Sequence, residues 1–348
     1  MQLFVLQENV PRETSPQVGI ARLAAASPLL AGKRTVEYFS LASKSILNRC
    51  TSRRVPFAWT INPYRGCEFG CKYCYARYTH EYMGMDDPLE FEEKIYSKER
   101  AGEILQRELA KDPGGAIAIG TATDPYQPAE RRFQTTRGIL QTIAQFRGLA
   151  VSITTKSDLV ARDLALLLEI RRGNDLQVNM TVTTMRAELA RRLEPRAPRP
   201  ELRLAAAATL AQAGIPVEVF AMPVLPAITD HPRDLEAVAR AAAQAGATRF
   251  AVNPLFLMPS AQKAFFPFIE AEFPHLAARY RRFYARSAYV QTQYRARILA
   301  LAEHLRQKYG LTGSARAYPA EAFAPAAQMQ LFRESSREPR GEIGRAHV

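Results

Sequence analysis

Six short apolar segments, each the length of a β-strand, recur along the chain and are separated by stretches of helical periodicity. Short apolar runs bounded by turn residues are typical of strands buried on both faces of a parallel sheet. Strands that alternate with helices predict consecutive βα units and hence an α/β fold. The predicted strands are Phe57–Ile61, Ala116–Thr121, Leu149–Thr155, Leu176–Thr183, Ile215–Met222 and Arg249–Asn253.

The strand-and-helix segment is flanked by two stretches of different character, which suggests three domains. Residues 1–50 have mixed polarity without a clear strand pattern, so we expect an N-terminal arm. Residues 51–260 hold the βα array, whose crossovers should all curl in the right-handed sense. Residues 261–335 have a helical period with interleaved aromatics and arginines, which predicts a C-terminal helical extension whose aromatic stripe packs on the array.

Three of the four cysteines, Cys67, Cys71 and Cys74, follow the first predicted strand in the spacing C-x3-C-x2-C. Three thiolates on one tight loop should converge on a common centre. A closed zinc site needs four protein ligands, whereas three suit a cubic iron–sulfur cluster that leaves one iron free for a small molecule. A zinc knuckle completed by Cys50 or His80, or a cluster with a redox role alone, remains an alternative.

The stretch INPYRGCEFGCKYCYARY, residues 61–78, resembles the signature of the radical S-adenosylmethionine (radical SAM) superfamily, with Tyr73 as the aromatic residue before the last cysteine. Further motifs, GTATDPYQP, TTKSD, LEPRAP and PVLPAITD, resemble the spore photoproduct lyase-like (DNA repair photolyase-like) branch. The resemblance covers residues 52–259. It implies a partial (β/α)6 TIM-type barrel, whose active site lies at the C-terminal ends of the strands.

The resemblance also implies the cofactors and the reaction. A 4Fe-4S cluster would be held by the three cysteines, and its fourth iron would chelate the amino and carboxylate groups of S-adenosylmethionine. An electron from the cluster would break the sulfonium bond and give a 5′-deoxyadenosyl radical, while the protein binds, orients and shields the cofactor. An external electron donor, flavodoxin- or ferredoxin-like, is the expected partner.

By the same resemblance, the loops after the strands supply the other cofactor-binding residues. Thr123 and Asp124 would bind the methionine amino group, and Thr121 in the same loop carries a further side chain able to bond it. Lys156 would meet the carboxylate, and Thr181, or Asn179 two residues earlier, would reach the ribose or carboxylate. Tyr73 completes the predicted set. Asp124 could instead form an Asp-Pro turn, and Glu194 is either a buried ion-pair anchor, the interpretation we favour, or a cofactor contact.

One departure from the branch concerns the donor of a hydrogen atom. Spore photoproduct lyase uses a cysteine in the loop after the second strand, whereas residues 120–124 here offer Thr121 and no cysteine. A threonine hydroxyl does not readily give up a hydrogen atom, so the resemblance does not extend to repair of the spore thymine dimer. Tyr75 is the candidate catalytic residue, as a radical relay.

The predicted function is hydrogen-atom abstraction from a substrate at the barrel mouth, and a nucleic-acid base is the candidate substrate. The net charge of +13 and the pI of about 9.8 suit a polyanionic partner, although an arginine-rich proteome would explain the same composition. A base would have to be single-stranded or flipped out to enter a barrel. The alternatives are a zinc- or cluster-stabilised nucleic-acid-binding protein without catalysis, and a radical enzyme acting on a metabolite or protein.

The location predicted from the sequence is the cytoplasm, and the predicted state is a monomer. No apolar run reaches the roughly 18–20 residues of a membrane span, and the N-terminal residues lack the pattern of a signal peptide. A reducing compartment favours metal ligation over disulfides for clustered cysteines. Residues 336–348 form a tail, of which Glu342–Val348 (EIGRAHV) resembles adapter read-through, so we expect the true C-terminus to be missing.

Overall fold

A seven-stranded sheet forms the centre of the computed structural model, which describes residues 18–32, 35–51 and 55–313. Six neighbouring strands are parallel, and β3 joins the edge antiparallel to β4. The strand order confirms the predicted partial barrel and places each predicted strand. In sheet order the strands are β11 (Arg249–Pro254), β10 (Val217–Val224), β9 (Asp175–Thr181), β8 (Ala150–Thr155), β7 (Ile117–Ile119), β4 (Trp59–Ile61) and β3 (Leu47–Arg49).

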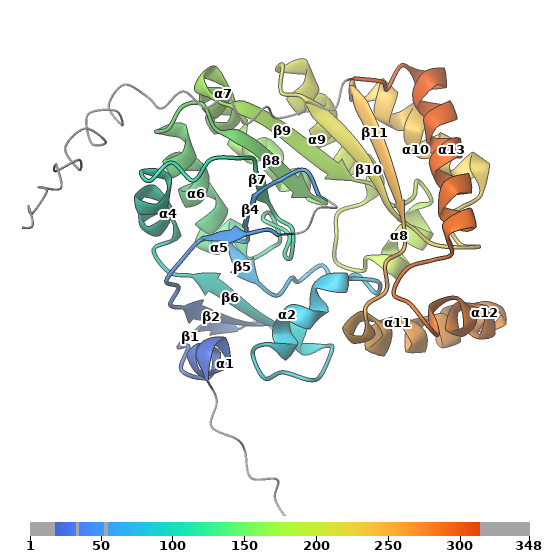
Figure 1. Cartoon of the computed structure of the whole chain (residues 1–348), viewed down its shortest axis with the longest axis horizontal. Helices are drawn as coiled ribbons and strands as arrows, with labels where there is room; N and C mark the ends of the chain where they lie inside the picture. The colour runs from blue at the N-terminus through green and yellow to red at the C-terminus, as the bar shows by residue number, and fades with distance from the viewer. Residues whose placement is uncertain (1–17, 33–34, 52–54, 314–348) are drawn as a thin grey trace, which may run out of the picture.

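Helices between the strands cover the outer face of this sheet (Figure 1). They bury one continuous apolar core against the strands, with Ile153, Val178 and Val219 fully buried at its centre. α9 and α10 each begin with a proline at the first turn, where its missing N–H costs nothing. The helices between the strands that contribute to this core are α4 (Ala101–Leu109), α6 (Thr135–Ala144), η2 (Asp158–Asp163), α7 (Leu164–Gly173), α9 (Pro200–Gln212) and α10 (Pro232–Gln244), whereas α5 (Glu130–Phe133) and α8 (Ala187–Leu193) do not.

A second sheet of four strands lies beside the barrel, in the order β1-β2-β6-β5. It corrects one expectation. Within the described part of residues 1–50, the structure contains α1 (Gly19–Ala25), β1, β2 and β3, so that part is more than an arm. Ser97 lies in a strand that pairs with two others, and α4 begins after that strand, at Ala101. The strands are β1 (Leu29–Gly32), β2 (Glu37–Leu41), β6 (Lys94–Lys98) and β5 (Tyr64–Arg65).

Three helices follow the barrel: α11 (Pro259–Glu272), α12 (Pro274–Tyr284) and α13 (Thr292–Tyr309). Tyr280 and Tyr284 of the predicted aromatic stripe are buried, and their hydroxyls donate to carbonyls of the barrel loops at Pro226 and Leu255. The predicted packing of this stripe is therefore confirmed. The tail at 336–348 lies outside the described residues.

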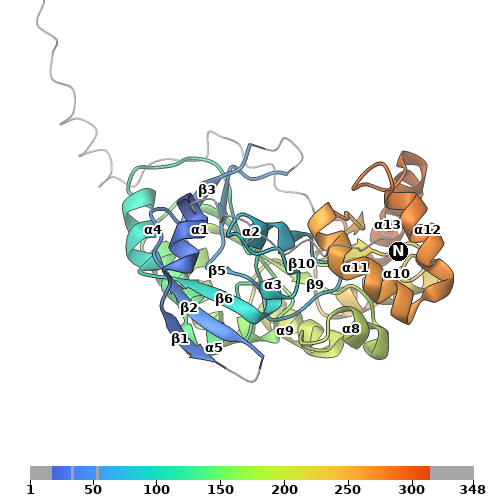
Figure 2. The same ribbon diagram turned by 90° about the horizontal axis from the view of Figure 1, so that it is seen from below.

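The small sheet and the α11–α12 pair lie at opposite ends of the molecule in both views (Figures 1 and 2). The short segments η1 (Tyr75–Arg77), α2 (Tyr78–Glu81) and α3 (Glu90–Glu93) lie in the connection between β5 and β6 of the small sheet. A second apolar core, which includes Cys67 and Cys71, joins this connection to α8, α11 and α12. No helix among the described residues is long and apolar enough to cross a membrane.

Candidate active site at the mouth of the barrel

The three clustered cysteines lie in the loop that follows β4, at the C-terminal end of the parallel strands. Cys67 and Cys71 are buried, Cys74 is half-buried, and all are free thiols. Burial, followed by Asp124 and the other two thiols, raises the pKa of Cys67 well above its ordinary value. Burial also raises the pKa of Cys71, to about 12. The three sulfurs are therefore close enough to act on one another's charge.

Backbone contacts give the cysteine loop its shape. The Cys67 N–H donates to Phe91 O at 2.9 Å, and the Arg77 guanidinium donates to Cys71 O at 3.1 Å. Gly66 has a φ of +81°, and a Cβ at that position would lie 2.7 Å from a backbone oxygen of β6. Gly70 has a φ of +63°, where a Cβ would meet the Glu92 carboxylate. Both positions require glycine because L-residues rarely adopt this conformation and no space is left.

Thr123, predicted to bind the methionine amino group, holds the cysteine loop from the neighbouring strand. Its hydroxyl donates to Gly66 O at 2.6 Å. Gln127, four residues later, donates to the same oxygen at 3.1 Å and accepts from the Glu68 N–H at 2.9 Å. The loop after β7 is thereby fixed to the cysteine loop, and the buried Thr123 hydroxyl is already used for a protein contact.

Asp124 joins the loops after β7 and β8. One carboxylate oxygen accepts from the Tyr126 N–H at 2.9 Å and the Thr155 hydroxyl at 2.7 Å. The other accepts from the Lys156 N–H at 2.7 Å. Burial raises the pKa of Asp124 despite these bonds. Asp124 thus sets the position of Lys156, and both of its oxygens have partners within the protein.

A buried network of charges lies next to Cys71. The Tyr73 hydroxyl donates to Glu194, and Thr183 donates to the same carboxylate at 2.6 Å. Arg203 forms an ion pair with the other oxygen of Glu194, and the side chains of both are at most 1% exposed. The favoured interpretation of Glu194 as a buried ion-pair anchor is therefore confirmed. The Lys156 ammonium lies over the Tyr73 ring, 5.8 Å from its centroid.

The charges of this network lower the pKa of Glu194 and raise the pKa of Lys156. Burial raises the pKa of Glu194, but Arg203, Lys156 and two hydrogen bonds together lower it below its ordinary value. Burial lowers the pKa of Lys156, yet Cys71 and Glu194 raise it above the ordinary value overall. Lys156 therefore carries a positive charge beside the thiols, and no hydrogen bond or ion pair to another described residue occupies its ammonium.

Thr181 and Thr121 lie at the same end of the sheet. Thr181 is buried at the end of β9, where its carbonyl accepts from Arg203 at 3.1 Å. Thr121 contacts Asn62 at 3.2 Å, and its carbonyl accepts from the Tyr75 hydroxyl. The structure thus brings all the predicted residues to one end of the barrel, and their roles toward a cofactor stay predictions.

Tyr75 lies on the open side of the cysteine loop, with 41% of its surface exposed. Its ring contacts Phe256, which follows β11, at a centroid distance of 6.3 Å, and Phe256 contacts Tyr289 at 4.5 Å. We call these three residues the aromatic group. Sequence reasoning did not bring the last two together with Tyr75, because they come from distant segments without a local signal.

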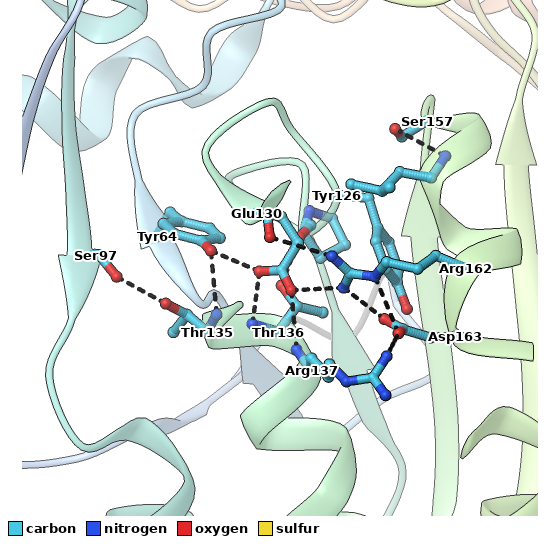
Figure 3. Close-up of polar contacts among 12 residues, drawn as sticks. Tyr64, Ser97, Tyr126, Glu130, Thr135, Thr136, Arg137, Ser157, Arg162 and Asp163 are labelled. Atoms are coloured by element: carbon cyan, nitrogen blue, oxygen red, sulfur yellow. Dashed lines mark hydrogen bonds and ion pairs between the residues drawn. The ribbon is translucent and has the colours of Figure 1, made fainter. Parts of the chain in front are cut away.

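A second network, also not predicted, fixes the barrel loops to the small sheet. Figure 3 shows the Glu130 carboxylate between Tyr64 of β5, Arg162 of η2 and the N-terminus of α6. It accepts from the Tyr64 hydroxyl at 2.5 Å, from Arg162 at 3.0 Å, and from the N–H groups of Thr136 and Arg137 at 2.8 and 3.1 Å. A carboxylate at a helix N-terminus is favourable because the free N–H groups point at it.

Within residues 18–32, 35–51 and 55–313, no group of three or more His, Cys, Asp or Glu side chains could hold a metal ion. A cavity of about 240 Å³ is lined by residues of β6, α4, α5 and α6, among them Lys98, and by none of the three cysteines. It is not part of the candidate site, which consists of the cysteine loop, Asp124, Lys156 and the Glu194 network.

Comparison with known proteins places the chain in a family. A model described as the radical SAM superfamily matches residues 61–241. An uncharacterised protein of Mycobacterium tuberculosis is 34% identical over 298 residues, which are 85% of this chain and 87% of that protein. An uncharacterised protein of Methanocaldococcus jannaschii is 31% identical over 196 residues, 56% of this chain and 70% of that one.

A solved structure of a spore photoproduct lyase variant with bound AdoMet (S-adenosylmethionine) and dinucleoside spore photoproduct is similar in fold. It has a TM-score of 0.53 at 12% identity and covers 79% of this chain and 77% of that chain. The family model, which matches more than half of the chain, shows that the chain belongs to the radical SAM superfamily, which implies an enzyme with a 4Fe-4S cluster and S-adenosylmethionine.

Proposed function

We propose that this chain binds a 4Fe-4S cluster through Cys67, Cys71 and Cys74, cleaves S-adenosylmethionine reductively, and abstracts a hydrogen atom from a substrate at the barrel mouth. The observation that carries the proposal is the position of three free thiols on one loop at the C-terminal ends of parallel strands, where Lys156 also lies. Active sites of barrels of this kind lie at that end.

The residues present fit the cluster by the chemistry of their donor atoms. Thiolates are the ligands of iron–sulfur clusters, and the three thiols form no disulfide. In a cubic cluster each thiolate binds a different iron, so the sulfurs need not surround one ion as they would in a zinc site. Burial keeps Cys67 and Cys71 protonated in the free chain, and bound iron would supply the positive charge that ionises them.

When bound by the three cysteines, the cluster would pass an electron from an external donor to S-adenosylmethionine and so supply the chemistry of hydrogen-atom abstraction. The protein's part is to bind and orient. The Lys156 ammonium, which no described residue bonds, would meet the methionine carboxylate, and Asp124 fixes the backbone from which Lys156 extends. Thr123 acts as a positioning residue through Gly66. Tyr75, exposed and next to Cys74, is the candidate radical relay.

A nucleic-acid base is the substrate class that we propose. The aromatic group offers partly exposed rings at the barrel mouth, with Tyr75 at 41% and Tyr289 at 47% exposure. Bases stack on such rings for about 1–3 kcal/mol each. The net charge of +13 would attract the phosphate backbone. A single-stranded or flipped base could reach the mouth, as the geometry of a barrel requires.

The experiment that tests the reaction is anaerobic reconstitution with iron and sulfide, followed by dithionite and S-adenosylmethionine. We expect 5′-deoxyadenosine from the wild-type chain and from Cys50→Ala, and none from Cys71→Ala. Cys50 is the matched control because it is a free cysteine outside the loop. Zinc in the purified protein without iron or sulfide would favour the alternative, a metal-stabilised nucleic-acid-binding protein without catalysis.

The substrate class is tested by binding of single-stranded oligonucleotides at several salt concentrations. We expect affinity to fall steeply with salt, and Tyr289→Ala to weaken binding by roughly 5- to 100-fold through lost stacking. Tyr82→Ala is the matched control, because Tyr82 is 67% exposed but lies outside the aromatic group. Equal affinity of both variants and the wild type would argue for a metabolite or protein substrate.

A further inference from the structure

Two basic side chains lie on the same face of the small sheet and form no hydrogen bond or ion pair to any residue that the structure describes. β5 and β6 pair antiparallel, with Tyr64 opposite Ser97 and Arg65 opposite Tyr96. Side chains alternate between the two faces of a strand, so Arg65 and Lys98 share a face and are diagonal neighbours across the pair. Consistent with this, Arg65 lowers the pKa of Lys98.

Neither cation has a counterion among the described residues. Lys98 is only 7% exposed, and its ammonium makes no hydrogen bond or ion pair there. The Arg65 Nε is buried and makes no hydrogen bond. The carboxylate that acts on Lys98, that of Glu108, already accepts from the Ser45 hydroxyl and from the N–H groups of Ile46 and Leu47.

Arg65 is half-buried, and two arginines that are more fully buried do have carboxylate partners. Arg203 pairs with Glu194, and Arg77 lies 3.6 Å from Glu92. Burial followed by Arg65 lowers the pKa of Lys98 to about 8. A buried charge without a partner is costly, and two adjacent cations are more so. Arg65 and Lys98 therefore have the properties of an anion-binding site, in which a bound anion would supply the negative charge that no described residue provides.

An oxyanion has acceptors for both cations. A guanidinium can bind two of its oxygens at once, and an ammonium can bind a third.

We propose that Arg65 and Lys98 form a binding site for a phosphate-class oxyanion, which uses neither the thiols nor Lys156. Arg65 directly precedes Gly66 of the cysteine loop. Two sources share this chemistry: a backbone phosphate of a nucleic-acid strand, and free phosphate or a phosphorylated small molecule. The site does not depend on the proposed radical reaction, because binding needs neither S-adenosylmethionine nor a reductant.

The test is equilibrium dialysis of labelled inorganic phosphate against the full chain, reconstituted anaerobically with iron and sulfide. We expect one bound phosphate per chain, and a Kd about 10- to 100-fold weaker in Lys98→Met, as for loss of a hydrogen bond to a charged group. Lys94→Met is the matched control on the same strand, because Lys94 is 36% exposed and already pairs with Glu90; its Kd should equal that of the wild type.

The free energy of unfolding, measured with and without phosphate, is a second readout that distinguishes an anion-binding lysine from a purely structural one. Without phosphate, Lys98→Met should be at least as stable as the wild type, because an unpaired buried charge has been removed. With phosphate, the wild type should gain stability and Lys98→Met should not. A chain that binds no phosphate at millimolar concentration, or a Lys98→Met variant with unchanged Kd, would overturn the proposal.

A competition arm identifies the source. If a short single-stranded oligonucleotide displaces the labelled phosphate from the wild type, the site takes a backbone phosphate. If the phosphate stays bound while the oligonucleotide binds elsewhere or not at all, the site takes a free or small-molecule phosphate. Both results support the site, and neither requires that S-adenosylmethionine be cleaved.

Discussion

Glu194 is the common partner in the buried network of polar and charged side chains next to Cys71. Its carboxylate contacts Tyr73, Thr183 and Arg203, and it also acts on the charge of Lys156. A buried charge pair contributes little net stability compared with apolar residues, but removal of one partner leaves the other unpaired. Substitution of Glu194 should therefore lower the free energy of unfolding, because Arg203 would lose its partner.

We predict that Glu194→Gln lowers the free energy of unfolding by about 3–5 kcal/mol, because Arg203 would remain buried without a counterion. Glu272→Gln is the control: Glu272 pairs with Arg192, but both side chains are 41% exposed, and such pairs contribute at most about 1 kcal/mol. Denaturant unfolding of both variants measures the difference. Equal losses would show that the buried pair has no special role.

His80 should make stability depend on pH. Burial, opposed in part by its hydrogen bond to Lys94 O, lowers the pKa of His80 from 6.5 to about 4. The unfolded chain therefore binds the proton more readily between these values, and the free energy of unfolding falls as pH falls from 6.5 toward 4. The full loss from this one group is about 3 kcal/mol.

Denaturant unfolding at several pH values checks this prediction, with His80→Gln as the comparison. The variant has no imidazole, so its stability should decline less than that of the wild type as the pH falls from 6.5 to 4. Parallel pH dependences of the two proteins would contradict a neutral, buried His80.

At the scale of elements, the cysteine loop depends on its contact with the strand β6. We predict that Gly66→Ala reduces cluster loading, because a Cβ would lie 2.7 Å from Lys94 O and 2.9 Å from Phe91 O at a φ of +81°. Gly214→Ala is the matched control: its φ is +87°, but nothing lies within 4 Å of its Cβ. Both pay the roughly 1–2 kcal/mol of a left-handed residue, and only Gly66→Ala also displaces the loop.

Iron and sulfide per chain after reconstitution measure this effect. We expect near wild-type loading in Gly214→Ala and a clear loss in Gly66→Ala. If both variants load equally, the close approach of the loop to β6 does not control the position of the thiols.

The barrel strands could be predicted because the residues of each strand show the apolar pattern of a buried strand by themselves. Segments such as Ile117–Ile119 and Ala150–Thr155 are apolar runs between turn residues, and burial on both faces makes the pattern continuous. β6 could not be predicted in the same way. Its five residues, Lys94–Lys98, begin and end with lysine, and their strand conformation depends on pairing with β2 and β5, which are distant in sequence.

The same distinction applies to the site. The spacing of Cys67, Cys71 and Cys74 is local and visible in the sequence. The partners of Glu194 come from three separate segments, so only the fold brings them together. That Arg65 and Lys98 share a face follows from strand register, which no single-sequence pattern reveals.

At the scale of the whole molecule, two sheets meet at the segment that carries the cysteines. Cys67 follows β5 of the small sheet and β4 of the barrel, so both sheets determine where its thiol lies. The buried Glu130 carboxylate connects the two bodies through Tyr64 on one side and Arg162 on the other (Figure 3). The small sheet, which the sequence did not predict, is therefore part of the support of the candidate active site.

The central claim is that three thiols hold a cluster with one iron open to S-adenosylmethionine. The most direct test is the electron paramagnetic resonance spectrum of the reduced, reconstituted chain before and after S-adenosylmethionine is added. The account predicts a 4Fe-4S signal whose g values shift when the cofactor binds, and no such signal in Cys71→Ala. A cluster spectrum that S-adenosylmethionine leaves unchanged, or a wild-type chain that binds no iron and sulfide, would contradict it.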